Sequence, residues 1–155
     1  MSEARFRFWQ RWLVAASGFF CAFGVIVAVF PNAFFLAPWT AALADVFYDG
    51  TEPPDAAAFR AFVLAPLGGT IAGSYLLQTC IAAVPFARRE QWAWWATVLA
   101  LALWFLVDST LSLIHGAVFN VLLINLAPLA IFVPPLVATR RAFFAGLPSL
   151  PAPTA

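Results

Sequence analysis

The sequence has little charge. Only 10 % of its 155 residues are Asp, Glu, Lys or Arg, and all eight basic residues are arginine. Soluble domains draw about a quarter of their residues from these four types, so this chain could not cover a water-exposed surface. The same composition excludes a disordered chain, which needs low hydrophobicity and high charge, and a nucleic-acid-binding protein, which needs a basic patch. We therefore expect an integral membrane protein whose main partner is the lipid bilayer.

Residues that build metal, haem or redox sites are also scarce. The chain has two cysteines, Cys21 and Cys80, and one histidine, His115. Both cysteines fall within long apolar stretches, where a free thiol behaves as a small hydrophobic residue. The sequence contains no CxxC or CxxCH motif. We therefore predict no metal site, and the sequence indicates no particular cofactor.

Long apolar stretches are abundant. A helix needs about 20 mainly apolar residues to cross the roughly 30 Å hydrocarbon core of a bilayer. None of the stretches alternates in polarity as the strands of a membrane β-barrel do. The predicted fold is an all-α integral membrane four-helix bundle, one domain over residues 1–141, followed by a disordered cytoplasmic tail over 142–155. The four predicted spans lie at about 12–30, 61–84, 92–114 and 117–137.

The charges outside the spans are sorted between the two sides. Seven of the eight arginines precede the first span, separate the second from the third, or follow the fourth, whereas the loop from Pro31 to Arg60 holds four acids. Short arginine-rich loops stay in the cytoplasm. Both termini are therefore predicted to be cytoplasmic, and the acidic loop to lie outside the cell.

The acidic loop is predicted to contain a short helix from Pro38 to Tyr48. Proline is favoured in the first turn of a helix, and Trp39, Leu43 and Phe47 recur at helical spacing on one side. A short helix with one apolar side is typical of the membrane interface.

Small residues predict where two spans approach closely. Gly69 and Gly73 form a G-x-x-x-G step in the second span, and the first span offers Ser17, Cys21 and Gly24. Small side chains let membrane helices pack backbone against backbone. We expect the first span to pack on the second through these residues, with a homo-oligomer seam as the alternative.

Asp108 is the only formal charge inside the four predicted spans. Ser112 and His115 follow it at intervals of four and three residues, so the three side chains share one face of a helix. An ionised carboxylate at that depth is unfavourable by a few kcal/mol and marks a candidate functional residue by default.

Three residues on other spans are candidate partners for this carboxylate. Asn120 and Asn125 bracket its depth in the fourth span, and Arg60 at the mouth of the second span has a long stem that could reach toward it. Two interpretations stay open. The polar residues either hold the helices together, or they line a ligand-binding pocket in the outer half of the bundle.

The layout resembles that of the DoxX-like small four-helix bacterial membrane proteins. The shared features are a first span ending at a proline, a short outer helix, an arginine ahead of a Gly-Gly step at Arg60, Gly68 and Gly69, and a basic end. The resemblance covers about residues 10 to 140. It implies a bacterial inner-membrane location and little about chemistry.

Three classes of function follow from these observations. The first is an accessory or small-molecule-binding membrane protein, alone or within a larger membrane complex. The second is an oligomeric small transporter or channel. The third is a membrane enzyme that uses Asp108 and His115 as an acid and base, but residues seven apart lie about 10 Å apart along a helix, and no catalytic set accompanies them. We therefore favour a protein that is not an enzyme.

Overall fold

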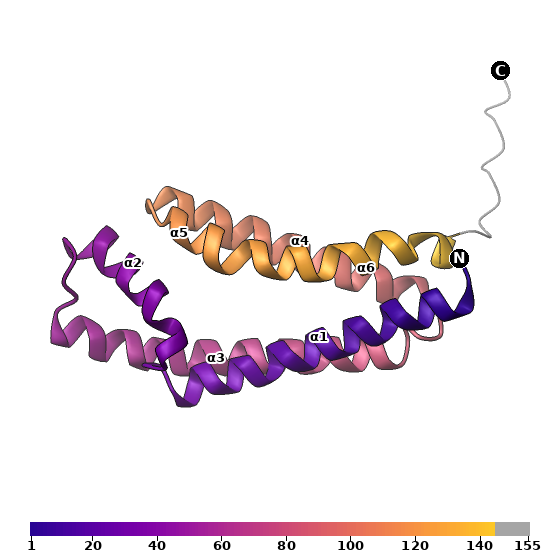
Figure 1. Cartoon of the computed structure of the whole chain (residues 1–155), viewed down its shortest axis with the longest axis horizontal. Helices are drawn as coiled ribbons and strands as arrows, with labels where there is room; N and C mark the ends of the chain where they lie inside the picture. The colour runs from indigo at the N-terminus through magenta and orange to yellow at the C-terminus, as the bar shows by residue number, and fades with distance from the viewer. Residues whose placement is uncertain (145–155) are drawn as a thin grey trace, which may run out of the picture.

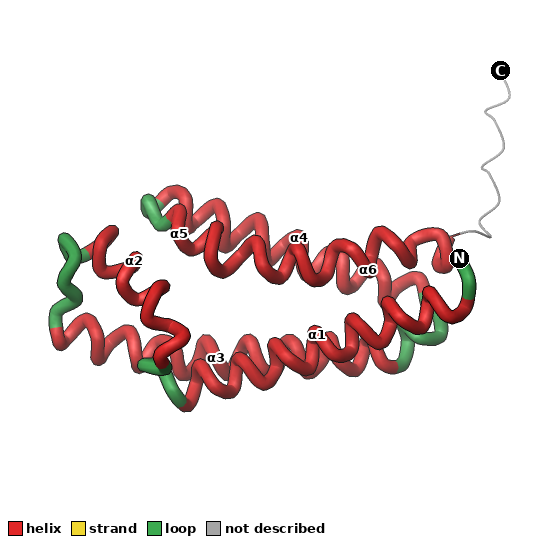
Figure 2. Tube along the Cα trace, in the orientation of Figure 1, coloured by secondary structure: helices red, strands yellow, loops and turns green. Residues whose placement is uncertain are grey.

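The computed structural model describes residues 1–144, and almost all of them are helical (Figure 2). Four helical segments are long and apolar enough to cross a membrane, which confirms the predicted all-α fold and makes the chain a four-span membrane protein. The fourth span changes helix type twice along its length. The spans are α1 (Glu3–Val29), α3 (Pro54–Ala83), α4 (Gln91–Ile114), and the series α5 (Val118–Asn120), η2 (Val121–Asn125) and α6 (Leu126–Phe144).

The spans are arranged as two pairs. Helix α1 lies along α3, and α4 lies along α6, as Figure 1 shows. The pairs meet at the end that holds the N-terminus and the arginine-rich loop 84–90, which we call the basic end. They separate toward the opposite end, which we call the α2 end because α2 (Ala37–Phe47) lies there between them.

Local sequence signals explain where the helices begin and end. Ser2 caps α1 through a hydrogen bond from the Arg5 amide to its Oγ. Pro38 and Pro54 stand in the first turns of α2 and α3, where a missing amide hydrogen does no harm. The short helix predicted from Pro38 to Tyr48 is thereby confirmed, with η1 (Phe34–Leu36) leading into it.

The end of the chain differs slightly from expectation. Helix α6 continues to Phe144, three residues past the predicted end of the bundle at 141. The rest of the predicted tail, 145–155, lies outside the described residues.

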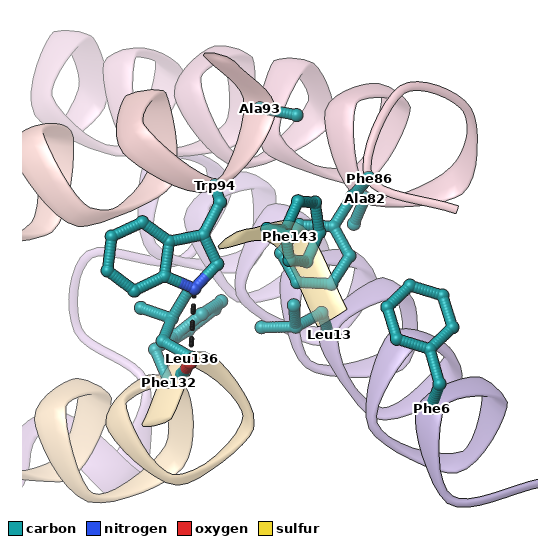
Figure 3. Close-up of a cluster of buried hydrophobic side chains, with 9 residues drawn as sticks. All are labelled: Phe6, Leu13, Ala82, Phe86, Ala93, Trp94, Phe132, Leu136 and Phe143. Atoms are coloured by element: carbon teal, nitrogen blue, oxygen red, sulfur yellow. Dashed lines mark hydrogen bonds between the residues drawn. The ribbon is translucent and has the colours of Figure 1, made fainter. Parts of the chain in front are cut away.

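The main hydrophobic core lies at the basic end and joins all four spans (Figure 3). Phe6 of α1 stacks on Phe86 of the 84–90 loop there, and Phe143 of α6 meets Phe86 edge-on. The Trp94 Nε1 atom of α4 donates a hydrogen bond to the Leu136 carbonyl of α6 at 3.0 Å. This bond joins α4 to α6 within one pair, and the aromatic packing holds the two pairs together at this end.

A hydrogen bond between the pairs compensates for a proline. Pro135 has no amide hydrogen, so the carbonyl of Ile131, four residues earlier, loses its helical partner. The Trp12 Nε1 atom of α1 donates a hydrogen bond to that carbonyl at 3.0 Å. Freed carbonyls in a membrane span need such a partner because lipid supplies none.

Helix α1 approaches α3 through glycines, but not through all of those expected. A Cβ atom on Gly68 would lie 2.5 Å from the Gly24 carbonyl oxygen and 2.6 Å from the Ala28 amide nitrogen, so only glycine fits. A Cβ atom on Gly69 or Gly73 would meet nothing within 4 Å. The close contact therefore runs through Gly24, as predicted, and Gly68 in place of Gly69 and Gly73.

The other small residues predicted for this contact differ in depth. Ser17 is fully buried, whereas Cys21 is half-buried. The Oγ atom of Ser17 has no hydrogen-bond partner among the described residues.

Candidate functional site

Asp108 lies in α4, about two turns from the α2 end, within a group of polar side chains. Its Oδ1 atom accepts hydrogen bonds from Ser112 Oγ at 3.1 Å, Asn120 Nδ2 at 2.9 Å and Asn125 Nδ2 at 2.8 Å. Hydrogen bonds to an ionised acceptor are stronger than those between neutral groups. We call these four residues and Ser109 the Asp108 cluster.

Asn125 is the most deeply buried member of the Asp108 cluster, with 0 % of its surface exposed. Besides Asp108, its Nδ2 atom reaches Ser109 Oγ at 3.0 Å, so the amide nitrogen is satisfied. Its Oδ1 atom is also buried and has no hydrogen-bond partner among residues 1–144. Because buried polar atoms nearly always have a partner, this oxygen is a candidate contact for a bound group.

The π-helix η2 explains how two asparagines of one span reach the same carboxylate. Residues five apart on an α-helix point about 140° away from each other, so Asn120 and Asn125 would face different neighbours. In η2 the Leu126 amide bonds the Val121 carbonyl, five residues back, and this wider turn brings both asparagines to one side.

Pro128 gives a reason for the wide turn. A proline ring in a regular α-helix clashes with the carbonyl four residues earlier, here that of Ile124, and has no amide hydrogen to give it. Widening the helix immediately before the proline relieves this conflict. Pro128 is itself buried, and π-helical turns of this kind occur frequently at functional sites.

Helix α2 contacts the Asp108 cluster through Trp39. The indole Nε1 atom donates a hydrogen bond to Asn120 Oδ1 at 3.1 Å, and the ring packs edge-on against Phe119. The carboxamide of Asn120 thus accepts from α2 and donates to Asp108. Two hydrogen bonds in series therefore connect the loop between α1 and α3 to the Asp108 carboxylate, which lies where α4 contacts the fourth span.

His115 does not join the cluster. It is exposed and caps the end of α4. The Ala117 and Gly116 amides bond the carbonyls of Ser112 and Leu113, and Gly116 has a φ of 74°, which is the usual glycine-terminated helix ending. Within residues 1–144 the hydrogen bonds to Asp108 include none from His115, so the acid and base pair considered from sequence does not form.

Arg60 also lies away from Asp108, so the ion pair considered from sequence does not form among the described residues. Its Nε atom lies 2.9 Å from Glu52 Oε1, and both side chains are only about a tenth exposed (11 % and 10 %). The guanidinium also donates to the Pro31 carbonyl and to Asn32 Oδ1, both at 3.3 Å. Arg60 therefore ties both ends of the loop that carries α2 to the start of α3.

Sequence reasoning missed three residues that matter for this geometry. Ser109 follows Asp108 in the chain, and its hydroxyl accepts a hydrogen bond from Asn125. Trp39 contacts Asn120, but its place in the sequence is typical of a tryptophan at the membrane interface. Glu52 was one of four acids in the loop, and nothing in the spacing singled it out as the partner of Arg60. Only the first of these carried a signal, its position next to the one charged residue of the span.

The donor set of the Asp108 cluster limits its chemistry. No group of three His, Cys, Asp or Glu side chains in residues 1–144 is placed to hold a metal ion. The cluster offers one carboxylate, two amides and two hydroxyls, which suit the recognition of a small polar or charged group.

Comparison with family models, curated proteins and solved structures found no match for this chain. The resemblance to the DoxX-like proteins is therefore carried by the layout of the spans alone. Any assignment of function has to come from the site itself.

Proposed function

We propose that this membrane protein is a small-molecule-binding protein whose Asp108 cluster holds a polar ligand in the half of the bilayer near the α2 end. The observation that carries this proposal is the Asn125 Oδ1 atom, buried beside a carboxylate without a hydrogen-bond donor. The ligand satisfies that oxygen, either with a hydrogen-bond donor or with a positive charge.

The alternative is that the cluster only holds α4 to the fourth span. Hydrogen bonds between membrane helices contribute about 0.6 kcal/mol each on average, and two of them, from Asn120 and Asn125, converge on Asp108 Oδ1. However, an unsatisfied buried acceptor destabilises a fold by roughly 1–3 kcal/mol. A purely structural role leaves this acceptor unsatisfied beside the one charged side chain of the spans, whereas a binding role gives it a partner.

The arginine distribution supports an orientation for the site. Seven arginines flank the spans at the basic end, and short loops of this kind stay in the cytoplasm. With both termini cytoplasmic, the Asp108 cluster lies in the outer half of the membrane, where α2 covers it. This orientation is the one expected of a bacterial inner-membrane protein of DoxX-like layout.

Native mass spectrometry of the protein released from lipid nanodiscs tests the binding proposal. We expect wild-type protein to carry a bound species that Asn125→Leu, which keeps the side-chain volume but removes the acceptor, does not carry. Gln78→Leu is the matched control, since Gln78 is also a span amide and donates to Thr97 Oγ1 at 3.0 Å, away from the cluster. A bare mass for wild type and Asn125→Leu alike would contradict the proposal.

A second candidate, an oligomeric transporter or channel, has one observation in its favour. Gly69 and Gly73 form an open small-residue face on α3 that no neighbouring side chain covers within 4 Å, and such faces pair membrane helices. Crosslinking in native membranes should then give an oligomer that Gly69→Leu and Gly73→Leu abolish. Unchanged crosslinking, or the absence of ion flux above that of empty vesicles, would remove this candidate.

A further inference from the structure

Asp108 is the one formally charged side chain of the four predicted spans, and no basic side chain of the described residues forms an ion pair with it. A charged group inside a bilayer is unfavourable, and the position of Asp108 near one end of its span reduces this cost without removing it. The ion pairs of residues 1–144 all lie elsewhere, joining Arg7 and Arg89 to Glu3, Arg60 to Glu52, and Arg88 to Glu90.

Two oxygen atoms of the cluster remain free to accept a hydrogen bond or to coordinate a cation. The Nδ2 atoms of Asn120 and Asn125 and the hydroxyl of Ser112 already point at Asp108 Oδ1. Asp108 Oδ2 and Asn125 Oδ1 accept no hydrogen bond from the described residues. A ligand that fits these two oxygen atoms must bring positive charge or hydrogen-bond donors.

The backbone around the Asp108 cluster also favours a positively charged ligand. Asp108 lies in the last two turns of α4, where the carbonyl end of the helix carries partial negative charge. Across from it, the wide turn of η2 and the missing amide of Pro128 interrupt the regular carbonyl pairing of the fourth span. Carbonyl oxygens at interrupted membrane helices are typical ligands for monovalent cations.

We infer that the Asp108 cluster binds one monovalent cation, held by Asp108 Oδ2 and Asn125 Oδ1. This inference rests on the proposed function and names the class of its ligand. A single positive charge matches the single carboxylate, whereas Ca²⁺ sites use several carboxylates among six to eight oxygen ligands. The bound cation neutralises Asp108 and satisfies Asn125 in one step.

The burial of the two residues indicates the direction of entry. Asp108 is partly exposed, whereas Asn125 is fully buried behind it. A cation therefore meets the carboxylate first and the amide oxygen second. Asn120 and its partner Trp39 of α2 stand next to this route.

Protection of Asp108 from dicyclohexylcarbodiimide tests the inference. This apolar reagent modifies protonated carboxyl groups in membranes, so a cation that binds Asp108 in place of a proton slows the reaction. Mass spectrometry of the Asp108 peptide measures the rate of modification. The protein is kept in nanodiscs at constant ionic strength in choline chloride, with part of the choline replaced by Na⁺, K⁺ or methylammonium. Asp108→Asn serves as the control for the site of reaction.

We expect at least one of the three cations to slow the modification of Asp108 about tenfold near 100 mM, with saturation. Na⁺ or K⁺ protection assigns an inorganic ion, and protection by methylammonium alone assigns an organic ammonium group. Asn125→Leu should abolish protection, and Gln78→Leu should retain it. The wild-type series decides the question even where a variant fails to fold.

Two results would overturn the inference. Modification of Asp108 at one rate in every cation would exclude a bound cation while leaving a neutral ligand, and so the proposed function, in place. Failure of Asp108 to react in the folded protein without cations, followed by reaction after unfolding in detergent, would show a site closed to small molecules. That second result would contradict both the cation and the proposed function.

Discussion

Replacing Gly68 by alanine should loosen the contact between α1 and α3, whereas the same replacement at its neighbour Gly69 should not. The added methyl group at Gly68 would stand 2.5 Å from the Gly24 carbonyl oxygen, against the 3.4 Å at which ordinary contact begins. The helices would have to move apart by about 0.9 Å along that line. The obstacle is backbone on both sides, so no side-chain rotation can relieve it.

The magnitude follows from two opposing effects. Forcing an extra methyl group into a packed contact is unfavourable by about 1–3 kcal/mol. Alanine also favours a helix over glycine by about 1 kcal/mol, and this gain applies equally to Gly68 and Gly69. The difference between Gly68→Ala and Gly69→Ala therefore isolates the packing effect and should be about 1–3 kcal/mol in the free energy of unfolding.

Equilibrium unfolding by SDS in mixed micelles, followed by tryptophan fluorescence, measures this difference. Gly68→Ala should unfold at a lower SDS fraction than wild type or at the same one, and Gly69→Ala at the same or a higher one. Equal midpoints for the two variants would refute the assignment of Gly68 to the contact. A lower midpoint for Gly69→Ala would place the seam where the G-x-x-x-G step predicts it.

Two further predictions concern bonds that stabilise the fold. Trp12→Phe should lower the free energy of unfolding by about 1 kcal/mol because the Ile131 carbonyl loses its donor. In a Pro135→Ala background a backbone amide replaces that donor, so the loss caused by Trp12→Phe should be smaller, and an equal loss in both backgrounds would contradict this. Arg60→Gln should lower the free energy of unfolding by about 3 kcal/mol, since it leaves Glu52 unpaired and largely buried. It should also speed proteolysis of the loop around α2, whereas Arg88→Gln, at an exposed pair, should do neither. Equal behaviour of the two arginine variants would argue against the role assigned to Arg60.

The fold was largely predictable because hydropathy and length decide where a chain crosses a bilayer. Four apolar stretches and a loop with Pro38 at a helix start led directly to the observed order of helices. The glycine contact was less predictable, because Gly68 and Gly69 point about 100° apart on the same helix. Which of the two glycines is buried depends on where α1 packs against α3.

The candidate site was predictable in part. Depth in the membrane brought Asn120 and Asn125 into consideration beside Asp108, although α-helical spacing would have set them on different faces. The π-helix that reconciles them depends on Pro128 and on packing against α4, which periodicity does not reveal. Arg60 was misplaced because the length of its stem permits many partners, and Glu52, eight residues earlier, holds it in the loop.

What lies at Asn125 Oδ1 decides most directly whether the Asp108 cluster is a binding site. A crystal structure of the protein grown in a lipidic mesophase at high resolution would show it. We predict non-protein density beside Asp108, within about 2.3–3.2 Å of Asn125 Oδ1. A protein donor on that oxygen, or close apolar packing with no density there, would contradict a binding site and leave the Asp108 cluster as a support between helices.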